Sequence, residues 1–332
     1  MKAAFKKGQT VQIKDLALRP LKHGEIRIKV DACGICGTDT HVNLAEADIE
    51  SPFGHEMAGR VLELGPGVDG LCVNQKVVIE SATPCGKCDN CRNTQQELCT
   101  DIQSFFFTGF FGFAEEAIVP AICAIPCDYL SPEVACISEP FGVAIDMVRL
   151  ADININSNVL IMGQGPIGLM ATALVKKAGA RRVFVTELSG RTARKDYALK
   201  LGVNEFIDPT QVALDKFDFG CKIDRILMTA PPKCLNDAFA IACKGAIISF
   251  IGIAHGDGAF CNFNVNDFHF KKLQLRASFA SPALYTPYAL KYLREGIIDG
   301  ESMISHRFKL ADIQKAMTAA NSPEALKVIV NP

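Results

Sequence analysis

The segment VLIMGQGPIGLM (159–170) places three glycines between an apolar strand and the expected start of a helix. Their spacing is G-x-G-x-x-G, which in this context is the fingerprint of a dinucleotide-binding βαβ unit. The first glycine permits a tight turn, the second lets the backbone approach a pyrophosphate, and the third allows the helix to pack closely on the sheet. The helix N-terminus then faces the phosphates. The residues expected at the cofactor are Gly163, Gly165, Pro166, Ile167 and Gly168.

An acidic residue, Glu187, ends the next expected strand, 24 positions after Gly163 (187 − 163). A carboxylate there accepts hydrogen bonds from both ribose hydroxyls and repels the 2′-phosphate of NADP. The sequence therefore favours NAD over NADP. Arg191, four residues further on, keeps NADP open, because an arginine nearby can accommodate that phosphate.

Two kinds of secondary-structure pattern divide the chain. The first part, up to about residue 140, consists of strands and turns, with alternating apolar residues in GEIRIKVDACGIC (24–36). From about residue 158 strands and helices alternate, which is typical of a parallel sheet covered by helices. Helices at 286–296 and 310–321 and a strand at 325–330 end the chain.

Composition limits the classes of function. A length of 332 residues suggests two domains, and a net charge of −1 gives no electrostatic case for nucleic acid or an anionic membrane. The N-terminus lacks the apolar core of a signal peptide, and the uncharged run 158–175 is interrupted by GQGPIG. Fourteen cysteines without a secretory signal indicate a reducing compartment, so we expect a cytoplasmic protein. The cysteines outside the clusters described next fall mostly in apolar runs, which predicts core packing.

Four cysteines in fifteen positions, CGKCDNCRNTQQELC (85–99), predict a metal site. The ligands are Cys85, Cys88, Cys91 and Cys99. The short spacings let the chain fold back on a tetrahedral ion, and four thiolates leave no position open for a substrate. A lobe held by structural zinc is our interpretation. The alternatives are four reduced surface thiols and a zinc ribbon that binds nucleic acid, although only Lys87 and Arg92 are nearby cations.

A second group of metal-binding residue types occurs upstream, in CGICGTDTH and GHEMAG. Cys36, His55 and Glu56 would supply a thiolate, an imidazole and a carboxylate for a catalytic zinc with one open position. Zinc lowers the pKa of a bound hydroxyl towards about 7. Thr38 and His41 are candidates to carry the released proton away.

With these motifs together, the chain resembles the zinc-dependent medium-chain alcohol dehydrogenases. The resemblance runs nearly end to end, through CGICGTDTH, GHEMAGRV, the four-cysteine lobe, GFAEEAIVP, SEPFGVAID, GQGPIG and LKVIV. Glu139, in SEPFG, is typical of the branch that contains the sorbitol, threonine and sugar dehydrogenases. In that branch Cys36, His55 and Glu56 would bind the catalytic zinc, with Glu139 a ligand or one water away.

The resemblance implies an α/β fold in which a Rossmann doubly wound parallel sheet is inserted in a mainly-β GroES-like catalytic domain with a structural zinc lobe. Residues 1–143 and 280–332 would form the catalytic domain, and residues 144–279 the NAD-binding domain. Two zinc ions and one NAD per chain are expected. The chain departs from the family in a short loop between Cys36 and His55, and in Glu116, where a tyrosine is usual.

The implied function is hydride transfer from a secondary alcohol to NAD. The substrate would be a polyol, sugar derivative, cyclitol or hydroxy amino acid, with L-threonine 3-dehydrogenase-like or sugar-phosphate dehydrogenase activity as alternatives. A second enzymatic alternative is a zinc-free reductase, against which the set of Cys36, His55 and Glu56 argues. An alternative of another class is a non-catalytic zinc-stabilised binding protein. The expected partner is a small alcohol, without nucleic acid or membrane. A homo-oligomer, dimer or tetramer, is also expected, because the edge strand 273–279 could extend a sheet between two copies.

Overall fold

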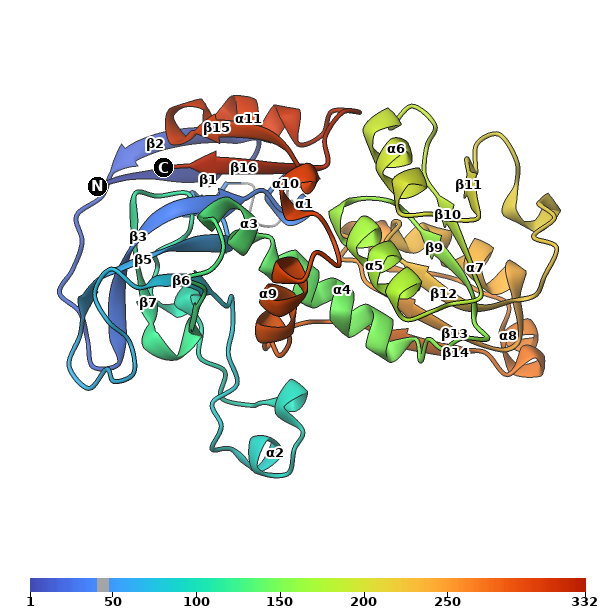
Figure 1. The fold of residues 1–332 in the computed structure, drawn as a ribbon, viewed down its shortest axis with the longest axis horizontal. Coiled ribbons are helices and arrows are strands. Elements are labelled where there is room, and N and C mark those ends of the chain that lie inside the picture. Colours follow the sequence, from blue (N-terminus) through green and yellow to red (C-terminus); the bar gives the residue numbers. More distant parts are fainter. Residues whose placement is uncertain (41–47) are drawn as a thin grey trace. The chain divides into compact units, whose positions relative to one another are not determined.

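The computed structural model describes residues 1–40 and 48–332 (Figure 1). The chain forms two compact units. Unit 1 comprises Met1–Gly142 and Ala280–Pro332, and unit 2 comprises Val143–Phe279. Unit 2 is therefore an insertion between the two segments of unit 1.

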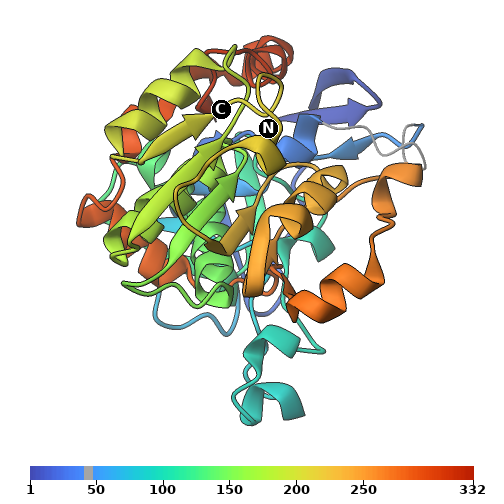
Figure 2. The ribbon, with the colours of Figure 1, turned by 90° about the vertical axis from the view of Figure 1, so that its right-hand side faces the viewer.

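Unit 2 is built on a six-stranded parallel sheet of order β11-β10-β9-β12-β13-β14. Its strands are β9 (Asn158–Met162), β10 (Arg182–Thr186), β11 (Glu205–Ile207), β12 (Ile223–Met228), β13 (Ala242–Phe250) and β14 (Gln274–Ala277). The helices are α5 (Pro166–Lys177), α6 (Thr192–Lys200), α7 (Leu235–Ile241) and α8 (Val265–Lys271), with α5 and α6 on one face and α7 and α8 on the other (Figure 2). This is the doubly wound sheet that the sequence predicted, with its switch point between β9 and β12.

The apolar run at 158–175 forms two elements of this unit. β9 is the central strand, and its residues from Val159 to Met162 are buried, as expected for a parallel strand covered on both faces. The glycine loop separates it from α5. No helix in the described part of the chain is long and apolar enough to span a bilayer.

Unit 1 is mainly β. A seven-stranded sheet has the order β15-β16-β3-β5-β6-β8, with β7 paired to β3, and a smaller sheet has the order β2-β1-β4. The strands are β1 (Lys2–Lys7), β2 (Thr10–Asp15), β3 (Glu25–Gly34), β4 (Ser51–Pro52), β5 (Glu56–Leu64), β6 (Lys76–Ile79), β7 (Glu116–Pro120), β8 (Ala124–Pro126), β15 (Ile304–Lys309) and β16 (Lys327–Asn331). The predicted fold class is confirmed.

The helices of unit 1 are short. They are α1 (Gly37–Thr40), α2 (Asp89–Arg92), α3 (Pro132–Cys136), α9 (Thr286–Arg294), α10 (Gly300–Met303) and α11 (Ile313–Ala319), and α4 (Ser138–Leu150) continues into unit 2. The helix expected over 310–321 begins as a 3-10 turn, Leu310–Asp312, before α11.

The buried side chains of β3 fix how this strand pairs with β5 next to the candidate site. Ile26, Ile28 and Val30 of β3 are fully buried, as their alternation predicted. β3 pairs antiparallel with β5, and Gly34 lies opposite Glu56. The last residue of β3 and the first of β5 are thus neighbours.

Candidate active site

The junction of β3 and β5 brings the first group of expected ligands together. Cys36 follows β3 by two residues, and His55 directly precedes β5. Gly54 has φ +92°, and a Cβ there would lie 2.5 Å from the ring of Phe113. Glycine at this position therefore lets the chain pass Phe113 and present His55 towards Cys36.

Cys36, His55 and Glu56 each direct a ligand atom to one place, and these atoms lie within 4.8 Å of one another. Ligands of one tetrahedral zinc are about 3.3–3.8 Å apart, so small side-chain movements would complete the site. Glu56 is buried, with 1% of its surface exposed, whereas Cys36 and His55 are half-buried. The thiolate, imidazole and carboxylate fit zinc, and three protein ligands are the number found at catalytic zinc sites.

Lys327, the first residue of β16, reaches the same place from the other end of the chain. Its ammonium group forms an ion pair with Oε2 of Glu56 and donates to the carbonyl of Ile35 at 2.9 Å. A Cβ at position 34 would collide with both side chains of the pair, so Gly34 makes room for them. The pair holds the Glu56 carboxylate beside the ligand atoms of the group.

Asp39, in α1, contacts two of the expected ligand residues. Its carboxylate accepts a hydrogen bond from the backbone N–H of Cys36 at 2.9 Å, and lies 3.8 Å from Nδ1 of His55. The side chain is buried, and burial raises the pKa of Asp39 above its usual value, against the charge of His55. Asp39 thus holds the backbone of Cys36 and lies beside the imidazole, where an outer partner of a metal ligand would lie.

Glu139, near the start of α4, interacts electrostatically with His55 and Glu56 but is not one of the three converging ligand residues. Among the described residues, the cluster of converging ligand atoms does not include Glu139. Burial, opposed by the charge of His55, raises the pKa of Glu139 to about 7. For His55, burial disfavours the imidazolium, but the hydrogen bond to Cys36 and the charge of Asp39 outweigh it and raise the pKa well above its usual value. A bound dication would offset the clustered negative charge.

Of the two residues expected to move the proton, the structure describes one. Thr38 lies in α1 with its side chain exposed. His41 lies outside the described residues. Phe106 lies beside His55: its ring centroid is 6.5 Å from that of His55, and 45% of its surface is exposed.

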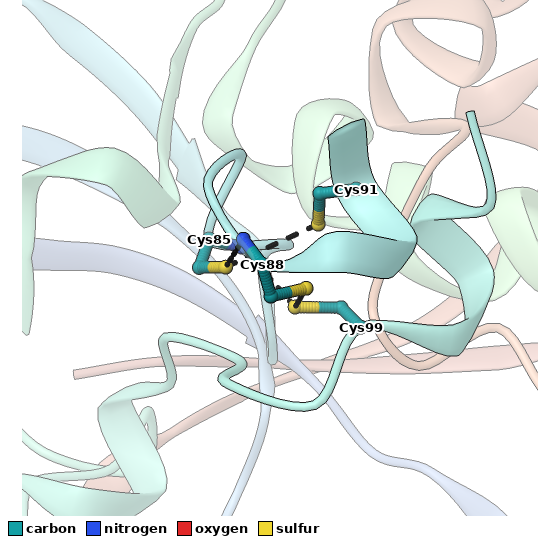
Figure 3. Close-up of side chains that lie close together, drawn as sticks. All are labelled: Cys85, Cys88, Cys91 and Cys99. Atoms are coloured by element: carbon teal, nitrogen blue, oxygen red, sulfur yellow. Dashed lines mark hydrogen bonds between the residues drawn. The ribbon is translucent and has the colours of Figure 1, made fainter. Parts of the chain in front are cut away.

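The four cysteines of the lobe converge, with their sulfur atoms pointing towards one another (Figure 3). Sγ of Cys85 is 4.0 Å from Sγ of Cys91, and Sγ of Cys88 is 3.9 Å from Sγ of Cys99. A zinc–sulfur bond of about 2.3 Å gives tetrahedral sulfur–sulfur edges of about 3.8 Å. These distances fit a zinc ion and are far too long for disulfides.

The surroundings favour the thiolate at Cys88, whereas burial raises the pKa of Cys91 to about 12. Sγ of Cys85 accepts from the backbone N–H of Cys88 at 3.3 Å, and Sγ of Cys99 from that of Cys85 at 3.3 Å. Backbone hydrogen bonds lower the pKa of Cys88 to about 6. Of residues 85–99, all described, only Cys91 is buried. The lobe therefore has almost no apolar core of its own.

The glycine loop of unit 2 has the geometry that a pyrophosphate requires. Gly163 has φ +93°, and its carbonyl accepts from Thr229 Oγ1 at 2.9 Å. A Cβ on Gly168 would collide with that carbonyl, whereas a Cβ on Gly165 would meet open space. Gly165 is the N-cap of α5, which begins at Pro166 with Ile167 half-buried beside it. The free space at Gly165, next to the helix N-terminus, fits the phosphates of a dinucleotide.

Glu187 follows β10 and lies against this loop. Its Oε2 accepts from the backbone N–H of Gln164 at 3.2 Å and lies 3.1 Å from Nη1 of Arg194. Arg191 is the N-cap residue of α6. Sequence reasoning named Glu187 and Arg191 but missed Arg194. It also missed Lys327, although a lysine in the apolar segment ALKVIV signals a buried anionic partner.

Comparison with known proteins gives two matches to family models. Residues 22–129 match the alcohol dehydrogenase GroES-like domain, and residues 166–293 match the zinc-binding dehydrogenase family. The first match contains the lobe cysteines and the cluster of Cys36, His55 and Glu56. The second contains the expected cofactor-binding residues from Pro166 onwards, whereas Gly163 and Gly165 lie just before it.

Relatives align along almost the whole chain. The L-threonine 3-dehydrogenase of Yersinia enterocolitica is 31% identical over 94% of this chain and 93% of its own length, and that of Pseudoalteromonas atlantica is 29% identical over 99% and 98%. A solved alcohol dehydrogenase of Escherichia coli, in complex with NADH, superimposes with a TM-score of 0.89 at 25% identity, covering 100% of this chain and 99% of that one.

Proposed function

The chain belongs to the zinc-binding alcohol dehydrogenases and is an NAD(P)-dependent oxidoreductase of secondary alcohols; we propose that Cys36, His55 and Glu56 form its catalytic zinc site and that a hydroxy amino acid or polyol is its substrate. The observation that carries the proposal is the convergence of these three ligand atoms within 4.8 Å in unit 1. A zinc ion bound there would polarise the substrate hydroxyl and lower its pKa towards about 7.

The surrounding residues hold the ligands in place. Asp39 fixes the backbone of Cys36 and lies beside His55, so the imidazole keeps one ring nitrogen for the metal. Lys327 neutralises Glu56 and leaves one carboxylate oxygen outside its ion pair. We propose Glu139, whose carboxyl group interacts electrostatically with His55 and Glu56, as a further ligand of the zinc or as a group one water away from it.

Thr38 and His41 are proposed to conduct the alcohol proton to solvent. The exposed hydroxyl of Thr38 supports this role, because a proton relay must end at water. The exposed face of Phe106 beside His55 would contact the carbon chain of the substrate.

For the substrate, the relatives favour L-threonine as the first compound to test. Both relatives described above are L-threonine 3-dehydrogenases, and the chain aligns with them over more than nine-tenths of its length. Polyols, sugar derivatives and cyclitols are the second candidates. A sugar phosphate is a further candidate substrate.

Unit 2 is proposed to bind NAD through Gly163, Gly165, Pro166, Ile167 and Gly168, with Glu187 at the adenosine ribose. The lobe cysteines would hold a second, structural zinc. Fourteen free cysteines favour a reducing compartment, and we place the enzyme in the cytoplasm. The largely exposed edge strand β14, near exposed Phe270 and Phe279, supports a homo-oligomer, either a dimer or a tetramer.

The test is an assay of NAD reduction with L-threonine, polyols, sugars and cyclitols, made on protein of measured zinc content. We expect two zinc ions per chain and turnover of at least one secondary alcohol. Protein with two zinc ions that reduces NAD with none of them would favour a non-catalytic binding protein.

A further inference from the structure

The loop between β10 and α6 contains a shielded ion pair at the site proposed for the adenosine ribose. Nη1 of Arg194 lies 3.1 Å from Oε2 of Glu187, and the two side chains are 17% and 12% exposed. Water and salt screen a pair this shielded less than they screen a surface pair. The carboxylate that should exclude NADP is therefore largely neutralised.

The hydrogen bonds of Glu187 show how the carboxylate is held. Oε2 accepts from the backbone N–H of Gln164 at 3.2 Å as well as from Arg194, and Oε1 accepts from the backbone N–H of Leu188 at 2.9 Å. A carboxylate has about four lone-pair directions, so room for a ribose hydroxyl remains. The Gln164 contact also places the Glu187–Arg194 pair against the glycine loop.

A second carboxylate holds the rest of this loop. Asp208 accepts from the backbone N–H of Ser189 at 2.8 Å and from its hydroxyl at 2.5 Å. Hydrogen bonds from Ser189 and Thr210 hold the pKa of Asp208 far below its usual range. Asp208 is thus held by backbone N–H groups and hydroxyl groups, which leaves the Arg194 guanidinium to Glu187.

We propose that Arg194 determines cofactor specificity, pairing with Glu187 when NAD is bound and with the 2′-phosphate when NADP is bound. A guanidinium group binds carboxylate and phosphate in the same forked geometry, so one side chain serves either anion. In NADP the phosphate is attached at the 2′ position, where NAD has the hydroxyl that would donate a hydrogen bond to Glu187. The phosphate therefore lies within reach of the guanidinium group that pairs with Glu187. Exchange of one anion for the other keeps Arg194 paired, and the site accepts both cofactors with NAD favoured.

The proposal rests on the proposed function only in that unit 2 binds a dinucleotide. It differs from a role in which Arg194 merely orients Glu187. If Arg194 only orients Glu187, its removal should weaken the binding of NAD, because only NAD uses the carboxylate. If Arg194 binds the 2′-phosphate, its removal should weaken the binding of NADP.

The experiment is calorimetric titration of the zinc-loaded protein with NADH and with NADPH, without alcohol, at one ionic strength. The variants are Arg194→Gln and Arg194→Lys. Lys200→Gln is the matched control, because it removes one positive charge from the exposed last turn of the same helix.

We expect Arg194→Gln to raise the Kd for NADPH about tenfold or more, the scale of a hydrogen bond to a charged group, and the Kd for NADH less than about threefold. Arg194→Lys should recover part of the NADPH affinity, and Lys200→Gln should change neither Kd by more than about twofold. Equal weakening of both cofactors, or selective weakening of NADH, would overturn the proposal. A wild-type protein that binds neither cofactor would instead overturn the proposed function.

Discussion

Lys327 and Glu56 form an ion pair in the interior of unit 1 although 271 residues separate them (327 − 56), and their side chains are only 2% and 1% exposed. Three strands make this contact. β16 brings the lysine, β5 brings the glutamate, and β3 lies between them with a glycine that leaves room for both side chains. The pair joins the C-terminal strand to the proposed catalytic site.

Replacement of Lys327 should therefore lower the free energy of unfolding by an amount that depends on whether zinc is bound. Lys327→Met leaves the Glu56 carboxylate buried without a cation, and breaking such a pair costs about 3–5 kcal/mol of unfolding free energy. The loss should be largest in chelated protein and smaller with zinc bound, because the metal supplies positive charge at the same place. Chemical denaturation of both forms measures this. Lys327→Arg, which keeps the charge, is the control, and equal losses with and without zinc would contradict the role of Glu56.

Gly54 should be required for the placement of His55. Gly54→Ala adds a Cβ that would lie 2.5 Å from the Phe113 ring, at φ +92°. Gly70→Ala is a matched control, because Gly70 has φ +81° with no atom within 4 Å. Both substitutions should cost about 1–2 kcal/mol of backbone strain. Only Gly54→Ala should also lose zinc and turnover, measured per folded molecule. Equal turnover in the two variants would contradict this, because it would show that the Phe113 ring moves away from the added Cβ while His55 keeps its position.

The lobe should depend on its metal. Cys88→Ser should remove about one zinc per chain and lower the melting temperature. The reason is that Cys91 is the only buried residue of 85–99, so the lobe has little apolar packing to stabilise it without the metal. Turnover per folded molecule should stay near that of wild type, since four thiolates leave no open position. Cys72→Ser, at an exposed cysteine of the same unit, should change none of these quantities. Full zinc content and an unchanged melting temperature in Cys88→Ser would refute the structural site.

The fold could be predicted well where the pattern is local. The apolar strand followed by the glycine loop and the expected start of a helix correspond to β9 and the beginning of α5. The strands β1 and β2 were not predicted, because their lysines and exposed residues hide the alternation. The expectation of core packing for the remaining cysteines was wrong for Cys72, which is exposed.

The candidate site could be predicted in its residue types but not in its connections. The spacing of CGICGTDTH and GHEMAG indicated the ligands, since each motif is short and rich in metal-binding side chains. The ion pair of Lys327 required knowledge of strand order across 271 residues. The contact of Arg194 with Glu187 depends on how the loop between β10 and α6 folds back, which no local pattern specifies. The roles of the individual site residues remain predictions.

The most direct test of the central claim compares zinc content, NADH binding and turnover in wild type, Cys36→Ser and His55→Ala. Wild type should hold two zinc ions per chain and lose turnover on dialysis against a chelator. Each variant should lose about one zinc and all turnover while its Kd for NADH changes less than about threefold, because the cofactor loop lies in unit 2. Turnover near the wild-type rate in either variant, or in chelated protein free of zinc, would contradict a catalytic zinc at Cys36, His55 and Glu56.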